Sequence, residues 1–278
     1  MEKIFKIKND FGIDIDLTFD CGQCFRFDKV EESRFEKEYR GVAYGKQVSF
    51  AQDGGYLYVI GADESEFDKL WRRYLSLDED YGAIHNEILS LSKNEALHRA
   101  LECGRGIRIL RQEPWEAICS FIISQNNNIP RIKGLISALS RTAGEEIGEG
   151  AYSFPTAEAV ASLGEDGLRA LKVGFRAPYI LDAAKKVACG ELDIPAISAL
   201  PTPDAQRALC AVKGIGPKVA QCALLFGFSK YDAFPVDVWI KRVIAKYFDE
   251  AFEPSLLGRY AGIAQQVLFY YERYTNGG

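Results

Sequence analysis

The chain has 278 residues, of which 47% are hydrophobic and 26% charged, a composition typical of a globular protein large enough for a sizeable core. No apolar run is long enough to span a membrane, and the start, MEKIFKIKNDFG, lacks a signal-peptide core, so neither a membrane partner nor export is expected. The net charge of −5 argues mildly against nucleic-acid binding, but it divides into −6 for residues 1–100 and +1 for residues 101–278. A basic face in the C-terminal part therefore remains open.

The first sixty residues are typical of an antiparallel sheet. Short segments rich in aromatic and β-branched residues are separated by Gly and Asp signals such as QDGG. We expect strands within residues 3–8, 23–30, 35–45, 46–52 and 56–62.

Helical spacing begins near residue 64 and continues to the end of the chain. Phe67, Leu70, Trp71 and Tyr74 recur at three or four residues, and later segments begin or end at Pro or Gly. The later helices are expected within residues 113–124, 129–144, 155–164, 166–174, 177–190, 203–212, 216–227, 236–248 and 259–274. These patterns predict an α+β chain: a small antiparallel sheet domain with trailing helices over residues 1–100, and a mostly helical region over residues 101–278.

The segment VKGIGPKVA, residues 212–220, predicts a tight turn between two helices. Gly214 and Gly216 allow a sharp hairpin, and its N–H groups, with the N-terminus of the next helix, suit a phosphate. A dinucleotide fingerprint does not fit, because no strand precedes the turn and Val219 holds the third glycine position. An ordinary corner between two helices is the alternative.

Lys218 is unusual because it is a cation in the first turn of an apolar helix, where the helix dipole disfavours positive charge. An amine attacks carbon only when neutral, and both partial burial and a helix N-terminus lower the pKa of a lysine. Lys218, Gln221 and Cys222 share one helix face by their spacing, so amine and thiol can reach one pocket. Alternatively, the lysine stem covers apolar surface while its amine stays in water.

Asp237 precedes a helix with a striped apolar face and is a candidate N-cap. N-cap aspartates are common and carry no function by themselves. Close to a pocket lysine, however, a carboxylate could stabilise a developing positive charge on a sugar and assist proton transfer.

The combination LCAVKGIGPKVAQCALLFG…FPVDVW strongly resembles the helix-hairpin-helix-Gly/Pro-Asp superfamily of DNA glycosylases. The resemblance implies that the hairpin with Gly214 and Gly216 binds a DNA phosphate, that Lys218 is the nucleophile, and that Asp237 completes the site. The presence of the lysine implies a glycosylase with lyase activity.

Two segments resemble the 8-oxoguanine DNA glycosylases of that superfamily. FIISQNNNIPRIKG is similar to the segment whose first asparagine fills the gap left by the flipped base and whose arginine reads the orphaned cytosine; these are Asn126 and Arg131. GFRAPY resembles the wedge segment, which implies that Phe175 lies beside the estranged base and Arg176 on its cytosine. Phe175 keeps the stacking face of the tyrosine found in eukaryotic members.

Two further segments resemble the base pocket of the same branch. CGQCFRF implies that the Gly22 carbonyl accepts the N7–H present in 8-oxoguanine and absent from guanine. YAGIAQQVLF implies that Gln265 contacts the base edge and Phe269 its face, with Cys222 on the opposite face. The resemblance covers residues 17–270.

Trp239 stands where eukaryotic members have a histidine two residues after the catalytic aspartate, so we expect Lys241 or Arg242 to make the phosphate contact there. No metal or cofactor is expected: the chain has two histidines, His85 and His98, one isolated CxxC at Cys21–Cys24, and no cysteine after Cys222. The seven cysteines favour reduced thiols in the cytoplasm.

The sequence thus predicts a monomeric DNA glycosylase and AP lyase that flips 8-oxoguanine, paired with cytosine, out of double-stranded DNA in base excision repair. Two alternatives stay open: a glycosylase for another damaged base and a DNA-binding module without catalysis. A Schiff-base aldolase is disfavoured, because the glycine hairpin gives it no phosphate-sugar rationale beyond DNA and because strands and helices do not alternate as a barrel requires.

Overall fold

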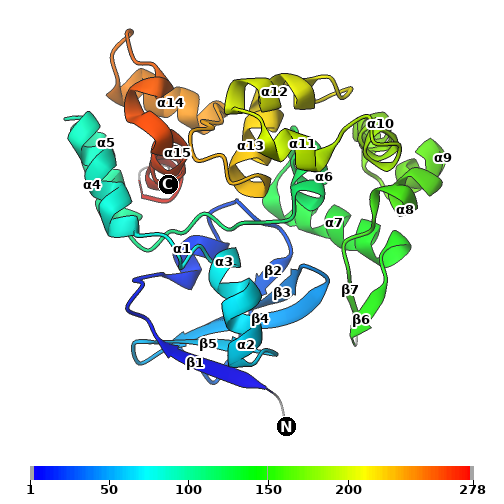
Figure 1. Cartoon of the computed structure of the whole chain (residues 1–278), viewed down its shortest axis with the longest axis horizontal. Coiled ribbons are helices and arrows are strands. Elements are labelled where there is room, and N and C mark those ends of the chain that lie inside the picture. Colours follow the sequence, from blue (N-terminus) through cyan, green and yellow to red (C-terminus); the bar gives the residue numbers. More distant parts are fainter. Residues whose placement is uncertain (1–2, 149, 276–278) are drawn as a thin grey trace.

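The N-terminal strands form one antiparallel sheet in the order β1-β5-β4-β3-β2, which lies below the helices in Figure 1. In the computed structural model, which describes residues 3–148 and 150–275, the turns between β3 and β4 and between β4 and β5 use positive φ at Gly45 and Gly55. The strands are β1 (Ile4–Lys8), β2 (Phe27–Lys29), β3 (Lys37–Ala43), β4 (Lys46–Asp53) and β5 (Tyr56–Ile60). All five predicted strands are therefore present, and β2 is shorter than expected.

An aromatic core fills the space between this sheet and the helices that cover it. In the register, Phe50 of β4 pairs with Tyr39 of β3, and its ring lies 5.5 Å from the ring of Trp71 and 6.0 Å from that of Tyr74. The covering helices are α1 (Ile15–Phe19), α2 (Glu64–Glu66), η1 (Phe67–Trp71) and α3 (Arg72–Tyr74). The spacing of Phe67, Trp71 and Tyr74 predicted this face, whereas α1 was not predicted.

Two buried helices form the centre of the helical region: α6 (Pro114–Ser124) and α13 (Pro217–Gly227). They approach closely because Gly227 lacks a side chain; an added Cβ would lie 2.6 Å from the Cβ of Ala117. Around them lie α4 (Tyr81–Leu91), α5 (Glu95–Cys103), α7 (Ile129–Ala143), α8 (Ala157–Ser162), α9 (Gly164–Ala170), η2 (Gly174–Arg176), α10 (Ala177–Ala188), α11 (Ile194–Ala199), α12 (Thr202–Cys210), α14 (Val238–Tyr247), η3 (Pro254–Tyr260), α15 (Ala261–Tyr270) and η4 (Tyr271–Thr275). The α+β prediction is confirmed.

One short hairpin interrupts the helices, β6 (Glu146–Gly148) with β7 (Ala151–Tyr152). It was not predicted, since only helical signals were found after residue 64. The loop after α7 is anchored by Ser153, whose backbone N–H donates to Glu145 O at 2.8 Å and whose Oγ accepts from Glu145 N at 3.0 Å.

The two hydrophobic cores divide the chain at a different place from the boundary expected at residue 100. The sheet-side core ends at Leu77, apart from Leu110, whereas Tyr81 and the buried residues of α4 and α5 belong to the helical core. Here α5 lies against α15 and α4 against η3. The packing partner of an amphipathic helix depends on the tertiary fold, and the sequence of residues 81–103 does not indicate which part of the chain covers their apolar faces.

Residues 19–27 pass between the two cores. Phe19, Cys24 and Phe27 are buried in the sheet-side core, while Cys21 and Phe25 are buried in the helical core. The Gln23 side chain fixes this crossing: its Nε2 donates to the carbonyl oxygens of Thr18 and Arg108, both at 2.8 Å, and its Oε1 accepts from Leu110 N at 2.8 Å. The crossing brings Gly22 to the helical region.

Candidate active site

The predicted glycine hairpin joins α12 to α13 on the protein surface. Gly214 has φ +80°, and an added Cβ would lie 2.2 Å from the ring of Tyr179, so both the turn and the packing exclude a side chain. Gly216 is the N-cap of α13 and is open to solvent, with no side chain capping the helix. The first-turn N–H groups of α13 are thus free of a side-chain acceptor, an arrangement that suits an anion.

A cavity of about 60 Å³ is lined in part by this helix and collects the four residues expected around the base and the two expected to be catalytic. It shares lining residues with a groove of about 740 Å³ that faces outward from the helical body. The cavity is lined by Cys21, Gly22, Phe121, Lys218, Cys222, Phe226, Pro235, Asp237, Gln265, Gln266 and Phe269. Residues far apart in the sequence, from the crossing segment, α13, α14 and α15, therefore meet at one small apolar hollow.

Lys218 is partly buried at this cavity, with its Nζ 5.8 Å from the centre of the Phe121 ring. Burial raises the pKa of the Cys222 thiol, against the opposing effect of the neighbouring lysine, so the thiol stays uncharged at neutral pH and packs as an apolar group. Gln221, expected on the same face, does not line the cavity, because its amide oxygen accepts from Phe234 N at 2.8 Å.

Asp237 is the N-cap of α14, as predicted. Its Oδ1 accepts hydrogen bonds from Trp239 N at 3.0 Å and Ile240 N at 2.8 Å. These bonds fix the carboxylate at the rim of both the cavity and the groove, on the side where Lys218 lies. The helix N-terminus, rather than the lysine, sets its position.

Gly22 and Phe269 face one another across the mouth of the cavity. Gly22 has φ +79°, and an added Cβ would lie 3.8 Å from Cε1 of Phe269 and 3.7 Å from Cδ1 of Ile129. Cys222 lines the same cavity and is buried. Gly22, Cys222 and Phe269 thus lie together around this one small cavity.

Gln265 lies in the wall of the cavity with a buried amide oxygen that has no hydrogen-bond partner among the described residues. A buried acceptor without a donor costs about 1–3 kcal/mol. Gln265 thus combines a place in the cavity wall with an acceptor that the described residues leave unused.

Asn126 and Phe175, expected at the vacated base position, both line the groove. Asn126 has φ +48° and is exposed, and Phe175 is 49% exposed despite being aromatic. Arg131 is also exposed and makes no side-chain bond to a described residue, although its backbone N–H is held by the N-cap Asn128 at 3.0 Å. Asn126 and Phe175 are therefore exposed in the groove, whereas Arg131 is exposed but does not line it.

Arg176, expected on the cytosine, has a buried side chain in this structure. Its guanidinium donates to the carbonyl oxygens of Gln125, Asn126 (3.1 Å) and Val173 (3.1 Å). These bonds use four of its five N–H groups and satisfy main-chain oxygens of the turn. In this structure Arg176 holds the Asn126 turn in place and does not line the groove.

Of the two cations expected to replace the family histidine, Lys241 lines the groove together with Trp239. Arg242 packs its guanidinium over the Trp239 ring, 4.8 Å from the centre. The structure thus presents Lys241, not Arg242, to the groove.

Two residues at the site were missed in the sequence. Phe121 of α6 stacks on Phe226 with ring centres 5.3 Å apart and forms the floor beneath Lys218; an apolar residue in a buried helix gives no signal of such a role. Arg273 lies over Phe269, 5.6 Å from its ring centre, at the mouth of the groove. Its position four residues after Phe269 would have placed it on the same helix face.

No group of three or more His, Cys, Asp or Glu side chains that could hold a metal ion occurs within residues 3–148 and 150–275. Across the same residues, no helix combines the length and the apolar character needed to cross a membrane.

Known families match both parts of the chain. Residues 4–118 match the "8-oxoguanine DNA glycosylase, N-terminal domain" and residues 119–251 the "HhH-GPD superfamily base excision DNA repair protein". A "Probable N-glycosylase/DNA lyase" of Methanothermobacter thermautotrophicus is 34% identical over 175 residues, 55% of this chain and 56% of that protein. The match thus spans little more than half of this relative's length. "N-glycosylase/DNA lyase OGG1" of Arabidopsis thaliana is 27% identical over 91% of this chain and 75% of its own length.

Solved structures match nearly the whole chain. The Clostridium acetobutylicum 8-oxoguanine glycosylase/lyase, in complex with double-stranded DNA containing cytosine opposite 8-oxoG, is 35% identical over 99% of this chain and 98% of its own, with a TM-score of 0.88. The structure of "MBOgg1 in complex with low affinity DNA ligand" is 36% identical over 99% of both chains, with a TM-score of 0.88. The glycine hairpin, the cavity and these matches define a base excision DNA repair protein of the HhH-GPD superfamily. Within it, the chain belongs to the 8-oxoguanine glycosylase/lyase family.

Proposed function

We propose that this protein excises 8-oxoguanine paired with cytosine from double-stranded DNA and then cleaves the strand at the abasic site. The observation that carries the proposal is the cavity that brings Lys218 and Asp237 together with the unpartnered oxygen of Gln265 and the turn at Gly22. Similar proteins named as 8-oxoguanine glycosylase/lyase support the same reaction.

Base flipping brings the damaged base into this cavity at a cost of a few kcal/mol for unstacking and unpairing. The base lies between Cys222 and Phe269 and donates from its edge to the Gln265 oxygen. The Gly22 carbonyl accepts the N7–H of 8-oxoguanine. Guanine lacks that hydrogen and leaves a buried carbonyl unpaired, a penalty on the order of 1–3 kcal/mol.

Lys218 supplies the nucleophile. Its neutral amine attacks the sugar C1′, the bond from C1′ to the base nitrogen breaks with its electrons leaving on the base, and the base takes up a proton. Asp237, fixed as an N-cap, stabilises the positive charge that develops on the sugar. Opening of the sugar ring leaves a Schiff base on Lys218, and elimination breaks the DNA strand on the 3′ side.

The remaining exposed groups bind the DNA around the lesion. Asn126 fills the gap, Phe175 stacks beside the estranged cytosine and Arg131 reads it, while Arg176 holds the Asn126 turn. Gly214 and Gly216 of the hairpin, with Lys241, contact phosphates through a helix N-terminus and a cation. The reaction takes place in the cytoplasm, because the seven cysteines are all free thiols, as is usual for proteins of a reducing compartment.

Borohydride trapping tests the proposal. A duplex with one 8-oxoguanine opposite cytosine is incubated with the protein and sodium borohydride, beside duplexes with undamaged guanine, an oxidised pyrimidine or an alkylated purine. We expect a covalent adduct on the 8-oxoguanine strand alone, retained in Lys185→Gln, an exposed lysine of α10, and lost in a folded Lys218→Gln variant.

Other outcomes would redirect the assignment. An adduct on a different damaged duplex would make the protein a glycosylase for that base. Binding to DNA without base release or adduct, unchanged in Lys218→Gln, would make it a binding module.

A further inference from the structure

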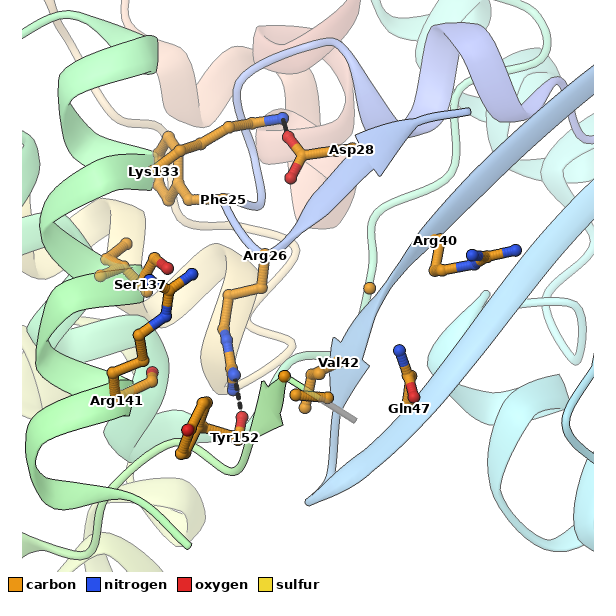
Figure 2. Close-up of a pocket in the computed structure, with 15 residues that line it drawn as sticks. Phe25, Arg26, Asp28, Arg40, Val42, Gln47, Lys133, Ser137, Arg141 and Tyr152 are labelled. Atoms are coloured by element: carbon orange, nitrogen blue, oxygen red, sulfur yellow. Dashed lines mark hydrogen bonds and ion pairs between the residues drawn. The ribbon is translucent and has the colours of Figure 1, made fainter. Parts of the chain in front are cut away.

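A second cavity, of about 220 Å³, lies between β2, β3, β7 and α7 and is shown in Figure 2. It is distinct from the base cavity, although Phe25 lines both this space and the DNA-facing groove. Its walls carry four cationic side chains, Arg26, Arg40, Lys133 and Arg141, and Asp28 is the one carboxylate among its described lining residues.

Two of these cations are neutralised within the protein. Lys133 donates to Asp28 at 2.8 Å and to Phe27 O at 2.6 Å, at the upper end of Figure 2. The guanidinium of Arg40 lies near Ser49 Oγ at 3.2 Å and Glu38 at 3.4 Å. These contacts pin β2 to α7 and leave little charge for a guest.

Arg26 is a buried cation with incomplete compensation. Its side chain is 9% exposed, donates to Tyr152 O, and lies 3.4 Å from a carboxylate oxygen of Glu116. The 3.4 Å contact is longer than a strong charge-assisted hydrogen bond, and burial raises the pKa of Glu116 to about 7, so the carboxyl group compensates the charge of Arg26 incompletely.

Two donors in the wall have no described partner. The Arg141 side chain makes no hydrogen bond or ion pair with any residue in 3–148 or 150–275, and Figure 2 shows it extending along the cavity toward Arg26. Ser140 is 2% exposed, and its hydroxyl is buried without a partner in the same part of the chain. Arg141 and Ser140 of α7 therefore bring donors without a described acceptor to the wall of this cavity.

The geometry points to an oxyanion site that takes a phosphate group, held by Arg141 and Arg26 with the Ser140 hydroxyl as a further donor. Arginine forks match the oxygens of phosphate, and burial strengthens the charge-assisted bonds of Arg26, whereas Arg141 is exposed to solvent. The bound group links the crossing segment, in which Arg26 lies directly before β2, to the last turns of α7. Since the same segment carries Gly22, occupancy stiffens the joint between the two cores.

The phosphate can come from two sources. Free inorganic phosphate needs nothing but access from solvent. A DNA backbone phosphate is also within reach, because α7 rises about 1.5 Å per residue and places Arg141 about 20 Å from Asn128, the N-cap beside the lesion-facing turn. In that case the contact lies on the duplex flanking the lesion.

Thermal unfolding without DNA tests the first source. Inorganic phosphate at 20 mM is compared with chloride at equal ionic strength for the wild type, Arg141→Gln and Ser140→Ala, with Arg169→Gln as the control for an exposed arginine in another last helical turn. We expect phosphate to raise the Tm of the wild type and the control by about 2–4 °C, and that increment to fall in both cavity variants. Ser140→Ala should not lower the Tm in chloride, since its hydroxyl has no described partner.

Duplex affinity tests the second source, using an abasic-site analogue in short and long duplexes. A loss of affinity in Arg141→Gln that occurs only with the long duplex assigns the site to backbone phosphate. Glu149 lies outside the described residues and directly precedes the lining residue Gly150, so the variant Glu149→Gln is included to test its carboxylate. The proposal is overturned if phosphate raises the Tm of Glu149→Gln but not that of the wild type. It is also overturned if Arg141→Gln and Arg169→Gln respond equally, both in the Tm increment with phosphate and in the affinity for the long duplex.

Discussion

Gln265 and Gln266 are neighbours on α15 and are almost equally buried, yet their side chains differ in hydrogen bonding. Gln266 donates from Nε2 to the Cys21 carbonyl at 2.9 Å, whereas the amide oxygen of Gln265 has no partner within the described part of the chain. Both residues line the cavity, but Gln266 supports the fold next to Gly22, whereas Gln265 keeps an acceptor that the described residues leave unused.

Leucine at each position should separate these two effects. Gln265→Leu should leave the free energy of unfolding unchanged or raise it by about 1 kcal/mol, because it removes an unpaired buried oxygen. It should lower kcat/KM for 8-oxoguanine excision by about 10–100-fold, the worth of one hydrogen bond to the base. Gln266→Leu should instead lower the unfolding free energy by about 1–3 kcal/mol. Urea unfolding and single-turnover excision measure both; equal destabilisation by the two variants would contradict the assignment.

Gly22→Ala should impair lesion excision beyond its effect on stability. The residue has φ +79° and lies next to Phe269, so the added methyl strains the turn and shifts the carbonyl that we propose accepts N7–H. The matched control is Gly45→Ala, which has φ +65° with nothing within 4 Å of the new Cβ. Both variants should lose about 1–2 kcal/mol of stability. We expect a loss of kcat/KM of at least tenfold in Gly22→Ala and none in Gly45→Ala. An equal loss of kcat/KM in both variants would show that backbone strain, and not the position of the Gly22 carbonyl, lowers the activity.

His85 should make the protein less stable as the pH falls. Burial, with the nearby charges of Arg108 and Arg105, lowers the pKa of His85 from 6.5 to about 4. The unfolded chain then binds the proton more readily, so stability present above pH 6.5 is lost progressively down to about pH 4, by up to about 3 kcal/mol. His85→Gln should flatten this dependence in unfolding curves measured from pH 7.5 to pH 4.5. The exposed His98→Gln should retain the wild-type slope, and a wild-type slope in His85→Gln would refute the cause.

Arg176 and Arg131 should behave differently when truncated. Arg176→Ala leaves the Gln125, Asn126 and Val173 carbonyls without their donor and should cost about 2–4 kcal/mol of stability, with excision reduced equally whatever base is opposite the lesion. Arg131→Ala, at an exposed position, should keep its Tm and lose preference for cytosine. Excision opposite each of the four bases measures this. A change of opposite-base preference without loss of stability in Arg176→Ala would mean that Arg176 reads the cytosine directly.

The sequence predicted those parts of the site that depend on local spacing. The hairpin at Gly214 and Gly216, the N-cap at Asp237 and the shared face of Lys218 with Cys222 all follow from residues close together in the chain. Such features are encoded by turn chemistry and helix periodicity, which act over a few residues. The meeting of Gly22 with Phe269 could be expected only from the family resemblance.

Features that depend on packing between distant segments could not be read this way. The motif alone implies that Arg176 contacts DNA. In the structure its guanidinium donates to three carbonyl oxygens, two of which belong to residues about fifty positions earlier in the chain. The attachment of α4 and α5 to the helical core likewise depends on α15 and η3, which come at the end of the chain. The unpartnered hydroxyl of Ser140 becomes visible only when α7 meets the sheet.

The crossing of residues 19–27 between two cores gives the lesion check and the chemistry different mechanical supports. Lys218 belongs to a helix buried within the helical core, while Gly22 lies in a segment whose side chains are anchored in both cores, so a relative displacement of the cores acts on the segment that carries the glycine. If heat or a distant substitution loosened that joint, the discrimination between 8-oxoguanine and guanine would fall before the rate of strand cleavage did. This architecture is therefore more sensitive to a loss of specificity than to a loss of activity.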